Sequence, residues 1–167
     1  MNRLKRFPHF RQNNVSDCGP TCLRMIARYY GVDYTAEMLR RHCHVSRRGV
    51  NMLGISEGAE HIGLDTVGMK MTFSQLAEEG VFPCILYWNQ SHFVVCYGIE
   101  RDKAGSYKIH ISDPASQRLT YTREEFERCW IGRRAEDKGC GVALMLEQGE
   151  NWGKVEDEYR KNSRSIL

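Results

Sequence analysis

Cys18 is a candidate nucleophile because of its place in the chain. It follows the polar stretch 12–17 and precedes Gly19 and Pro20, and an apolar segment, residues 23–30, comes next. This pattern predicts a cysteine where the chain turns into a helix, where unpaired N–H groups and the helix dipole favour negative charge. Both effects stabilise a thiolate, the reactive form of cysteine. The alternative is that Cys18 is one of seven cysteines that fill space in the core.

His92 and Asp113 are candidate partners, because a cysteine nucleophile needs a base and a group that orients the base. His92 starts one apolar segment of strand length, residues 93–99, and Asp113 follows the next, residues 106–111. If these segments pair as antiparallel neighbours, the two side chains lie at one edge of the sheet. We therefore expect Asp113 to reach the His92 ring. The alternatives are a surface histidine and a turn-forming aspartate before proline.

Gln12 lies six residues before Cys18 and is a candidate oxyanion donor. Together with the backbone N–H of Cys18, its side-chain amide could hold the oxyanion of a tetrahedral intermediate. The chain order Gln, Cys, His, Asp, with the cysteine on a helix and the other two on a sheet, is the papain-like arrangement.

The elements that must position these residues change in character along the chain. Helices are expected at residues 18–30, 35–43 and 51–62, followed by strands and two short helices. The strands are expected at residues 64–71, 84–88, 93–99, 106–111, 117–121 and 141–146, and the short helices at residues 72–79 and 122–129. This order predicts an α+β fold in which an N-terminal helical lobe packs on an antiparallel, meandering sheet.

The domain prediction is one unit over residues 1–146. Residues 147–167 are charged and poor in aliphatic side chains, so they are expected to form a surface tail or a linker toward a transmembrane domain absent from this chain. No stretch approaches the roughly 18 apolar residues of a membrane span. The odd number and irregular spacing of the cysteines argue against a disulfide framework and favour the cytosol.

Composition also argues against several kinds of ligand. The net charge is only +3, with scattered basic residues apart from Arg40-Arg41 and Arg47-Arg48, so no nucleic acid is expected as a partner. Cys18 and Cys22 lack the second pair of ligands that a structural zinc ion needs, so no metal is expected. No glycine-rich phosphate loop is present, and no cofactor is expected in this chain.

The segment 12–31, QNNVSDCGPTCLRMIARYYG, resembles the active-site signature of the double-glycine leader peptidases. These are papain-like cysteine peptidase domains at the N-terminus of ABC transporters that export bacteriocins and other peptides. The later segments SHFVV and SDP resemble the histidine and aspartate motifs of this family, so the similarity covers residues 10–146. The resemblance implies Cys18 as the nucleophile, His92 as general base and acid, Asp113 as the orienting carboxylate and Gln12 as the oxyanion donor.

The resemblance also implies a substrate and a setting. The substrate would be a precursor with an amphipathic helical leader that ends in Gly-Gly, Gly-Ala or a similar pair, cut during export by the transporter. An apolar surface groove would hold the leader helix, and Met25, Met52 and Leu53 are candidates for it, although each also fits a core position. The domain would be cytoplasmic, at the N-terminus of an inner- or cell-membrane transporter. Its partners would be transmembrane and ATPase domains, and ATP would bind only to the absent nucleotide-binding domain.

Two other functions remain open at this point. One is a different papain-like Cys-His-Asp enzyme, such as a transglutaminase or an acyltransferase, which would not need the signature at residues 12–31. The other is a non-catalytic leader-binding module, and the presence of Cys18, His92 and Asp113 argues against it.

Overall fold

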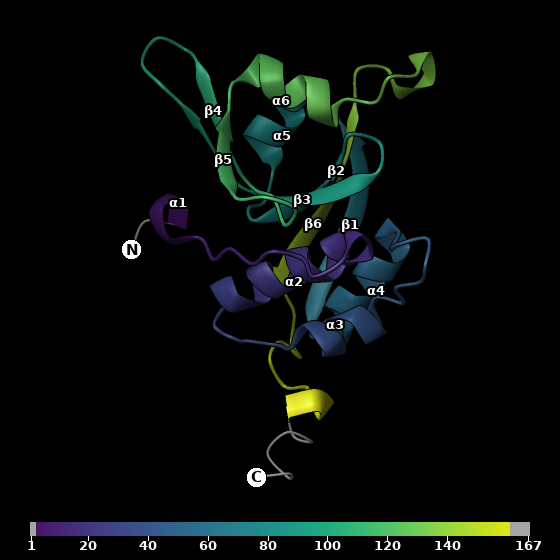
Figure 1. The fold of residues 1–167 in the computed structure, drawn as a ribbon. Coiled ribbons are helices and arrows are strands. Elements are labelled where there is room, and N and C mark those ends of the chain that lie inside the picture. The colour runs from purple at the N-terminus through teal and green to yellow at the C-terminus, as the bar shows by residue number, and fades with distance from the viewer. Residues whose placement is uncertain (1–2, 161–167) are drawn as a thin grey trace.

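A central antiparallel sheet organises the molecule (Figure 1). The computed structural model describes residues 3–160, and over this range the sheet has six strands in the order β1-β6-β2-β3-β4-β5. The strands are β1 (Leu64–Met71), β2 (Cys84–Trp88), β3 (His92–Arg101), β4 (Tyr107–Ser112), β5 (Arg118–Tyr121) and β6 (Gly141–Gln148). The predicted α+β class is confirmed.

Helices cover both faces of the sheet (Figure 1). One face carries α2 (Cys18–Tyr29), α3 (Ala36–His42) and α4 (Met52–His61), and the other carries α5 (Phe73–Glu79) and α6 (Arg123–Trp130). Shorter pieces are α1 (Arg3–Arg6) and the 3₁₀ helices η1 (Val15–Asp17) and η2 (Ala135–Asp137). Within residues 3–160, no helix combines the length and the apolar character that crossing a membrane requires.

Side-chain caps explain why several helices begin where the sequence predicts. Thr35 accepts a hydrogen bond from the Met38 N–H at the start of α3, and Asn51 accepts one from the Gly54 N–H at the start of α4. Thr72 and Thr122 form full capping boxes at α5 and α6. Each cap satisfies N–H groups that the helix itself cannot, so the polar residue marks the boundary.

Two apolar layers form because successive strand residues point to opposite faces. Ile85 and Val95 pack with α2, α3 and α4, whereas Leu86 and Trp88 pack with α5 and α6. The first layer also holds Phe93, at the start of β3. This layer therefore joins the helix that begins at Cys18 to the strand that begins at His92.

The position of β6 departs from the expected meander. Only β2, β3, β4 and β5 follow one another across the sheet. β6 instead lies between β1 and β2, pairs with β1 along its full length and pairs with β2 at Ile85 and Leu86. The last strand thus closes the middle of the sheet, a long-range pairing that local sequence patterns do not reveal.

The segment after β6 packs on the helical lobe. β6 runs to Gln148, so the predicted boundary at residue 146 falls inside a strand. The Trp152 ring lies 5.9 Å from that of Tyr30, and the Asp157 carboxylate accepts hydrogen bonds from the Thr35 N–H and hydroxyl at 2.6 and 3.0 Å. Trp152 and Asp157 thus have specific partners in the helical lobe, although they belong to a polar stretch. Of the predicted tail, residues 161–167 lie outside the described part of the chain.

Candidate active site

Cys18 is the first residue of α2, and the turn η1 leads into it. Its side chain belongs to the main apolar cluster and is only 6% exposed. Gly19 allows this helix end to pack closely, because a Cβ there would lie 2.6 Å from Val50 Cγ1 and 2.7 Å from Ile55 Cγ1. A larger residue would push the helix end away from α4. The thiol is therefore mounted on a rigid, tightly packed helix end.

Asp17, the residue before Cys18, is hydrogen-bonded to the helical lobe. Its carboxylate accepts hydrogen bonds from Arg40 Nη1 at 2.7 Å and from Asn14 Nδ2 at 3.0 Å, and its carbonyl accepts one from the Thr21 hydroxyl at 2.7 Å. Because Asp17 is buried, the arginine also neutralises a charge that would otherwise stand beside the thiolate. Sequence reasoning missed this pair, and the only available signal was a charged residue at the mouth of an apolar helix.

His92 opens β3, and its Nε2 lies 2.7 Å from Asp113 Oδ1. The Cys18 side chain lies close enough to the same imidazole to contribute to the rise of its pKa. Because Nε2 is taken by Asp113, Nδ1 is the ring nitrogen left to face the thiol. The structure thus brings together the three residues that the sequence singled out, from the start of α2, the start of β3 and the loop directly after β4.

The electrostatics of this triad favour a charged imidazole. Burial lowers the pKa of His92, but hydrogen bonds to Asp113 and Cys18 outweigh burial and raise it to about 9. Burial raises the pKa of Asp113, but hydrogen bonds from His92 and from the Ala115 N–H outweigh it and leave the pKa below its usual value. At neutral pH the arrangement therefore suits an imidazolium beside the Asp113 carboxylate.

Cys22 has a different role from Cys18, one helical turn away. Its Sγ donates to the carbonyl of Phe93 at 3.5 Å and so joins α2 to the residue that follows His92. Burial, followed by the nearby Cys18, raises the pKa of Cys22 well above its usual value. Cys22 therefore stays a thiol and serves the packing between the two halves of the site.

The N-terminal segment 7–12 lies against the loop that carries Asp113. His9 Nδ1 lies 2.7 Å from Ser112 Oγ, and the Gln12 backbone N–H donates to the Pro114 carbonyl at 2.8 Å. These contacts fix the residues on either side of Asp113. Sequence reasoning had no signal for them, because they join positions about a hundred residues apart.

The Gln12 side chain faces the turn η1. Its Nε2 donates to the carbonyls of Asn14 and Val15 at 2.9 and 3.3 Å, whereas its Oε1 is buried without a hydrogen-bond partner. In this state the amide hydrogens are directed at the loop before Cys18. The role of Gln12 as an oxyanion donor stays a prediction.

A cleft leads away from Cys18 along the surface. The first hollow has a volume of about 420 Å³ and is lined by Asn14, Val15, Ser16, Cys18, Arg47, Arg48, Gly49, Val50 and Ser91. The second has a volume of about 530 Å³ and is lined by Arg48, Val50, Asn51, Met52, Tyr87, Ser91, Phe93 and Val142. They share Arg48, Val50 and Ser91, so the two hollows adjoin. The end of the cleft beside Cys18 thus continues into a more apolar end.

Comparison with known proteins places this site in a family. The sequence model of the peptidase C39 family matches residues 6–135. The chain belongs to the peptidase C39 family. Its members are cysteine peptidases, and the solved domains of this family share the mixed helix and antiparallel-sheet architecture seen here.

Several C39 relatives are exporters. The chain is 36% identical over its whole length to a probable microcin-H47 secretion/processing ATP-binding protein of Escherichia coli, and 34% identical over 98% of its length to the colicin V secretion/processing ATP-binding protein of Escherichia coli. It spans about a fifth of these relatives, 22% and 21% of their lengths. A solved double glycine motif protease from an AMS/PCAT transporter, in complex with the leader peptide, aligns with a TM-score of 0.74 and 32% identity, over 86% of this chain and 92% of that chain.

The three predicted groove residues lie in different places in this C39 domain. Met25 is fully buried, and its sulfur accepts a hydrogen bond from the Ser112 hydroxyl at 3.2 Å, so it belongs to the core and not to a surface groove. Met52 lines the second hollow of the cleft. Leu53 is 67% exposed and lines another hollow. Met25 was a poor candidate because helical spacing alone does not tell which apolar residue remains accessible.

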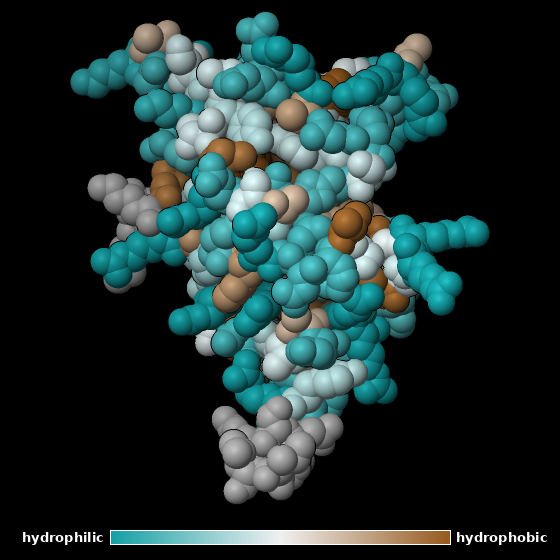
Figure 2. All heavy atoms as spheres, viewed as in Figure 1, coloured by the Kyte–Doolittle hydropathy of each residue, from teal (hydrophilic) through white to brown (hydrophobic). Residues whose placement is uncertain are grey.

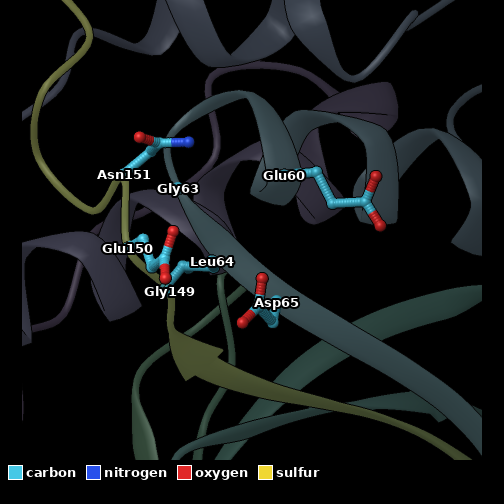
Figure 3. Close-up of a pocket in the computed structure, with 7 residues that line it drawn as sticks. All are labelled: Glu60, Gly63, Leu64, Asp65, Gly149, Glu150 and Asn151. Atoms are coloured by element: carbon cyan, nitrogen blue, oxygen red, sulfur yellow. The ribbon is translucent and has the colours of Figure 1, made fainter.

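A separate acidic hollow lies away from Cys18 in the C39 domain. It is lined by Glu60, Gly63, Leu64, Asp65, Gly149, Glu150 and Asn151. Its carboxylates do not converge, since Glu60 points away from Glu150 (Figure 3). Among residues 3–160 no group of three or more His, Cys, Asp or Glu side chains is arranged to hold a metal ion.

Proposed function

We propose that this C39 peptidase domain removes the leader from a bacteriocin-like precursor peptide after a Gly-Gly-type pair. The observation that supports this most is that Cys18, His92 and Asp113 lie together at the start of α2, with His92 hydrogen-bonded to Asp113. The similarity to a double glycine motif protease in complex with a leader peptide supports the choice of substrate.

In the first half of the reaction, the Cys18 thiolate attacks the carbonyl carbon of the second residue of the pair. The negative charge moves to the carbonyl oxygen, for which the Cys18 N–H and Gln12 are the proposed donors. The His92 imidazolium then donates its proton to the leaving amide nitrogen, and the C–N bond breaks. The cargo leaves with a free amine, and the leader remains bound to Cys18 as a thioester.

In the second half, water hydrolyses the thioester. The now neutral His92 accepts a proton from the water as it attacks, and the leader leaves with a new carboxyl group. Asp113 keeps the imidazole oriented in both halves through its hydrogen bond to Nε2. It need not change its own protonation state.

The leader is proposed to lie in the apolar end of the cleft. Val50, Met52, Tyr87, Phe93 and Val142 line this end, and it adjoins the hollow that contains Cys18. An amphipathic helix could place its apolar side there and its polar side in water. Of the groove residues predicted from sequence, Met52 is the one that this placement retains.

The proposed partners follow from the relatives. Both Escherichia coli relatives are secretion/processing ATP-binding proteins, so transmembrane and ATPase domains of a parent transporter are proposed as partners. ATP would then act in the ATPase domain and not in this chain. The peptidase domain would work on the cytoplasmic side, where the precursor still carries its leader.

The direct test is mass spectrometry of a precursor peptide incubated with the chain. We expect one cut, after the glycine pair, with the mass of water added across the two products. Cys18→Ala should abolish the cut and leave binding of the leader intact, because it removes only the nucleophile. Cutting by the alanine variant would exclude Cys18 as the nucleophile.

The same experiment separates the alternative functions. A transglutaminase or acyltransferase would join the acyl group to an added amine, and the product would carry the mass of the amine and not of water. A non-catalytic module would bind the precursor and leave it whole.

A further inference from the structure

Arg47 and Arg48 are held at the tip of a tight hairpin turn. The Ser46 N–H donates to the Gly49 carbonyl at 3.1 Å, and the Gly49 N–H donates back to the Ser46 carbonyl at 2.9 Å. Gly49 has a φ of 97°, a conformation that glycine adopts without strain. The turn thus fixes the backbone of two adjacent arginines between α3 and α4.

Both arginines line the hollow that contains Cys18, and Arg48 also lines its apolar continuation. Neither side chain forms an ion pair with a carboxylate among the described residues, whereas Arg40 and Arg41 on the preceding helix pair with Asp17 and Glu158. No acidic residue lines either hollow. Two arginines without an acidic partner among the described residues therefore line the same hollow as Cys18.

Resting on the proposed function, we propose that Arg47 and Arg48 recognise an acidic side chain of the precursor peptide close to the glycine pair. The glycine pair itself offers no side chain to bind, so selectivity among precursors has to come from neighbouring residues. A carboxylate at a neighbouring position would find two guanidinium groups whose charges have no other partner in the cleft.

An acidic peptide fits this site better than a nucleic acid does. A nucleic-acid surface carries a stripe of basic residues that follows the phosphate backbone. Here the two arginines stand alone at one turn, and the cleft continues into apolar residues, including Val50, Met52 and Val142. The face seen in Figure 2 is largely hydrophilic, with apolar residues in small separate patches.

The test uses matched precursors that differ at one position near the glycine pair. Glutamate, glutamine and lysine are placed in turn at each position on either side of the pair, and kcat/KM is measured at low salt. At one position we expect glutamate to be cut about three- to tenfold faster than glutamine, and lysine more slowly, with the preference shrinking as salt is added. The side on which it appears shows whether leader or cargo is recognised.

Variants then assign the preference to the turn. In Arg47→Gln/Arg48→Gln the glutamate-to-glutamine ratio should fall to about one, and in Arg47→Glu/Arg48→Glu the lysine peptide should become the better substrate. Arg133→Glu is the matched control, because Arg133 is also exposed and lines none of the hollows described above. It should leave the ratio unchanged.

Binding of the same peptides to Cys18→Ala, followed by fluorescence anisotropy, tests recognition without turnover. If no peptide is cut but glutamate still binds more tightly than glutamine, the proposed reaction fails and the recognition stands. Equal kcat/KM and equal affinity for all three peptides at every position would overturn the role of the arginines. So would a preference that survives in Arg47→Gln/Arg48→Gln or disappears in Arg133→Glu.

Discussion

At the scale of single residues, Cys18 and Cys22 lie one helical turn apart and have different roles. Cys18 helps to raise the pKa of His92, whereas Cys22 donates to the Phe93 carbonyl and has a raised pKa because it is buried. Their types are identical, so the difference comes entirely from their surroundings. The sequence distinguished them only because Cys18 stands at the predicted helix end and has Gln12 six residues before it.

The charge on His92 leads to a prediction for the pH dependence of activity. Despite burial, hydrogen bonds to Asp113 and Cys18 raise its pKa to about 9, and in the proposed reaction the imidazolium is the form that protonates the leaving amine. We expect kcat/KM to hold through neutral pH and to fall as pH rises through about 9. The stability that the charged ring contributes should likewise be full below about 6.5, its ordinary pKa, and be lost as pH rises through about 9.

Asp113→Asn is the variant that checks the cause of this pKa. Removing the carboxylate charge should move the basic limb of the pH profile to lower pH, besides slowing the reaction. The comparison is a pH profile of kcat/KM for both proteins. A basic limb that stays in place would show that Asp113 does not raise the pKa of His92.

At the scale of elements, the helix and strand boundaries were largely predictable, and their arrangement was not. The local signals are N-cap residues, and each caps the helix that starts at the next residue: Thr35, Asn51, Thr72 and Thr122. The insertion of β6 between β1 and β2 depends on pairing across about 75 residues, which no local pattern encodes. The burial of Met25 and the place of Arg48 in the cleft likewise depend on how the elements pack.

The link between α3 and η1 gives a prediction at this scale. Arg40 on α3 holds the buried Asp17, so Arg40→Ala leaves a carboxylate without its cation directly before Cys18. We expect a loss of about 1–3 kcal/mol in the free energy of unfolding, since Arg40 itself is partly exposed. We also expect a fall in kcat at nearly constant KM, because the thiol is displaced while the cleft is kept.

The control for this variant is Arg41→Ala, one residue along the same helix. Arg41 is mostly exposed, and its Nη1 lies 3.6 Å from Glu158 Oε1. Glu158 is far in sequence from the turn before Cys18. Urea unfolding and steady-state kinetics on both variants make the comparison. Arg40→Lys keeps a positive charge at this position and should restore part of the rate. Equal effects of Arg40→Ala and Arg41→Ala, or no restored rate in Arg40→Lys, would argue that the Asp17 contact does not position Cys18.

At the scale of the whole molecule, the active site lies where the helical lobe meets the sheet. Cys18 comes from the lobe, His92 opens β3, and Asp113 directly follows the adjacent strand β4. This meeting was predicted from the order of the elements and the antiparallel pairing of two strands, and the resemblance of residues 12–31 to a known signature added support. The contacts of His9 and the packing of residues 149–160 on the lobe were not anticipated, since both join distant parts of the chain.

We propose that Cys18 is the nucleophile, and not one of the other six cysteines, because it lies where the helical lobe meets the sheet. The most direct measurement is labelling by a leader peptide that ends in a Gly-Gly chloromethyl ketone, read by mass spectrometry. Cys18 and Cys22 share the tryptic peptide 12–24, so fragment ions must locate the label. We expect one label per chain, on Cys18, formed much more slowly in His92→Ala. Labelling of Cys22 or another cysteine, or a rate that does not depend on His92, would contradict it.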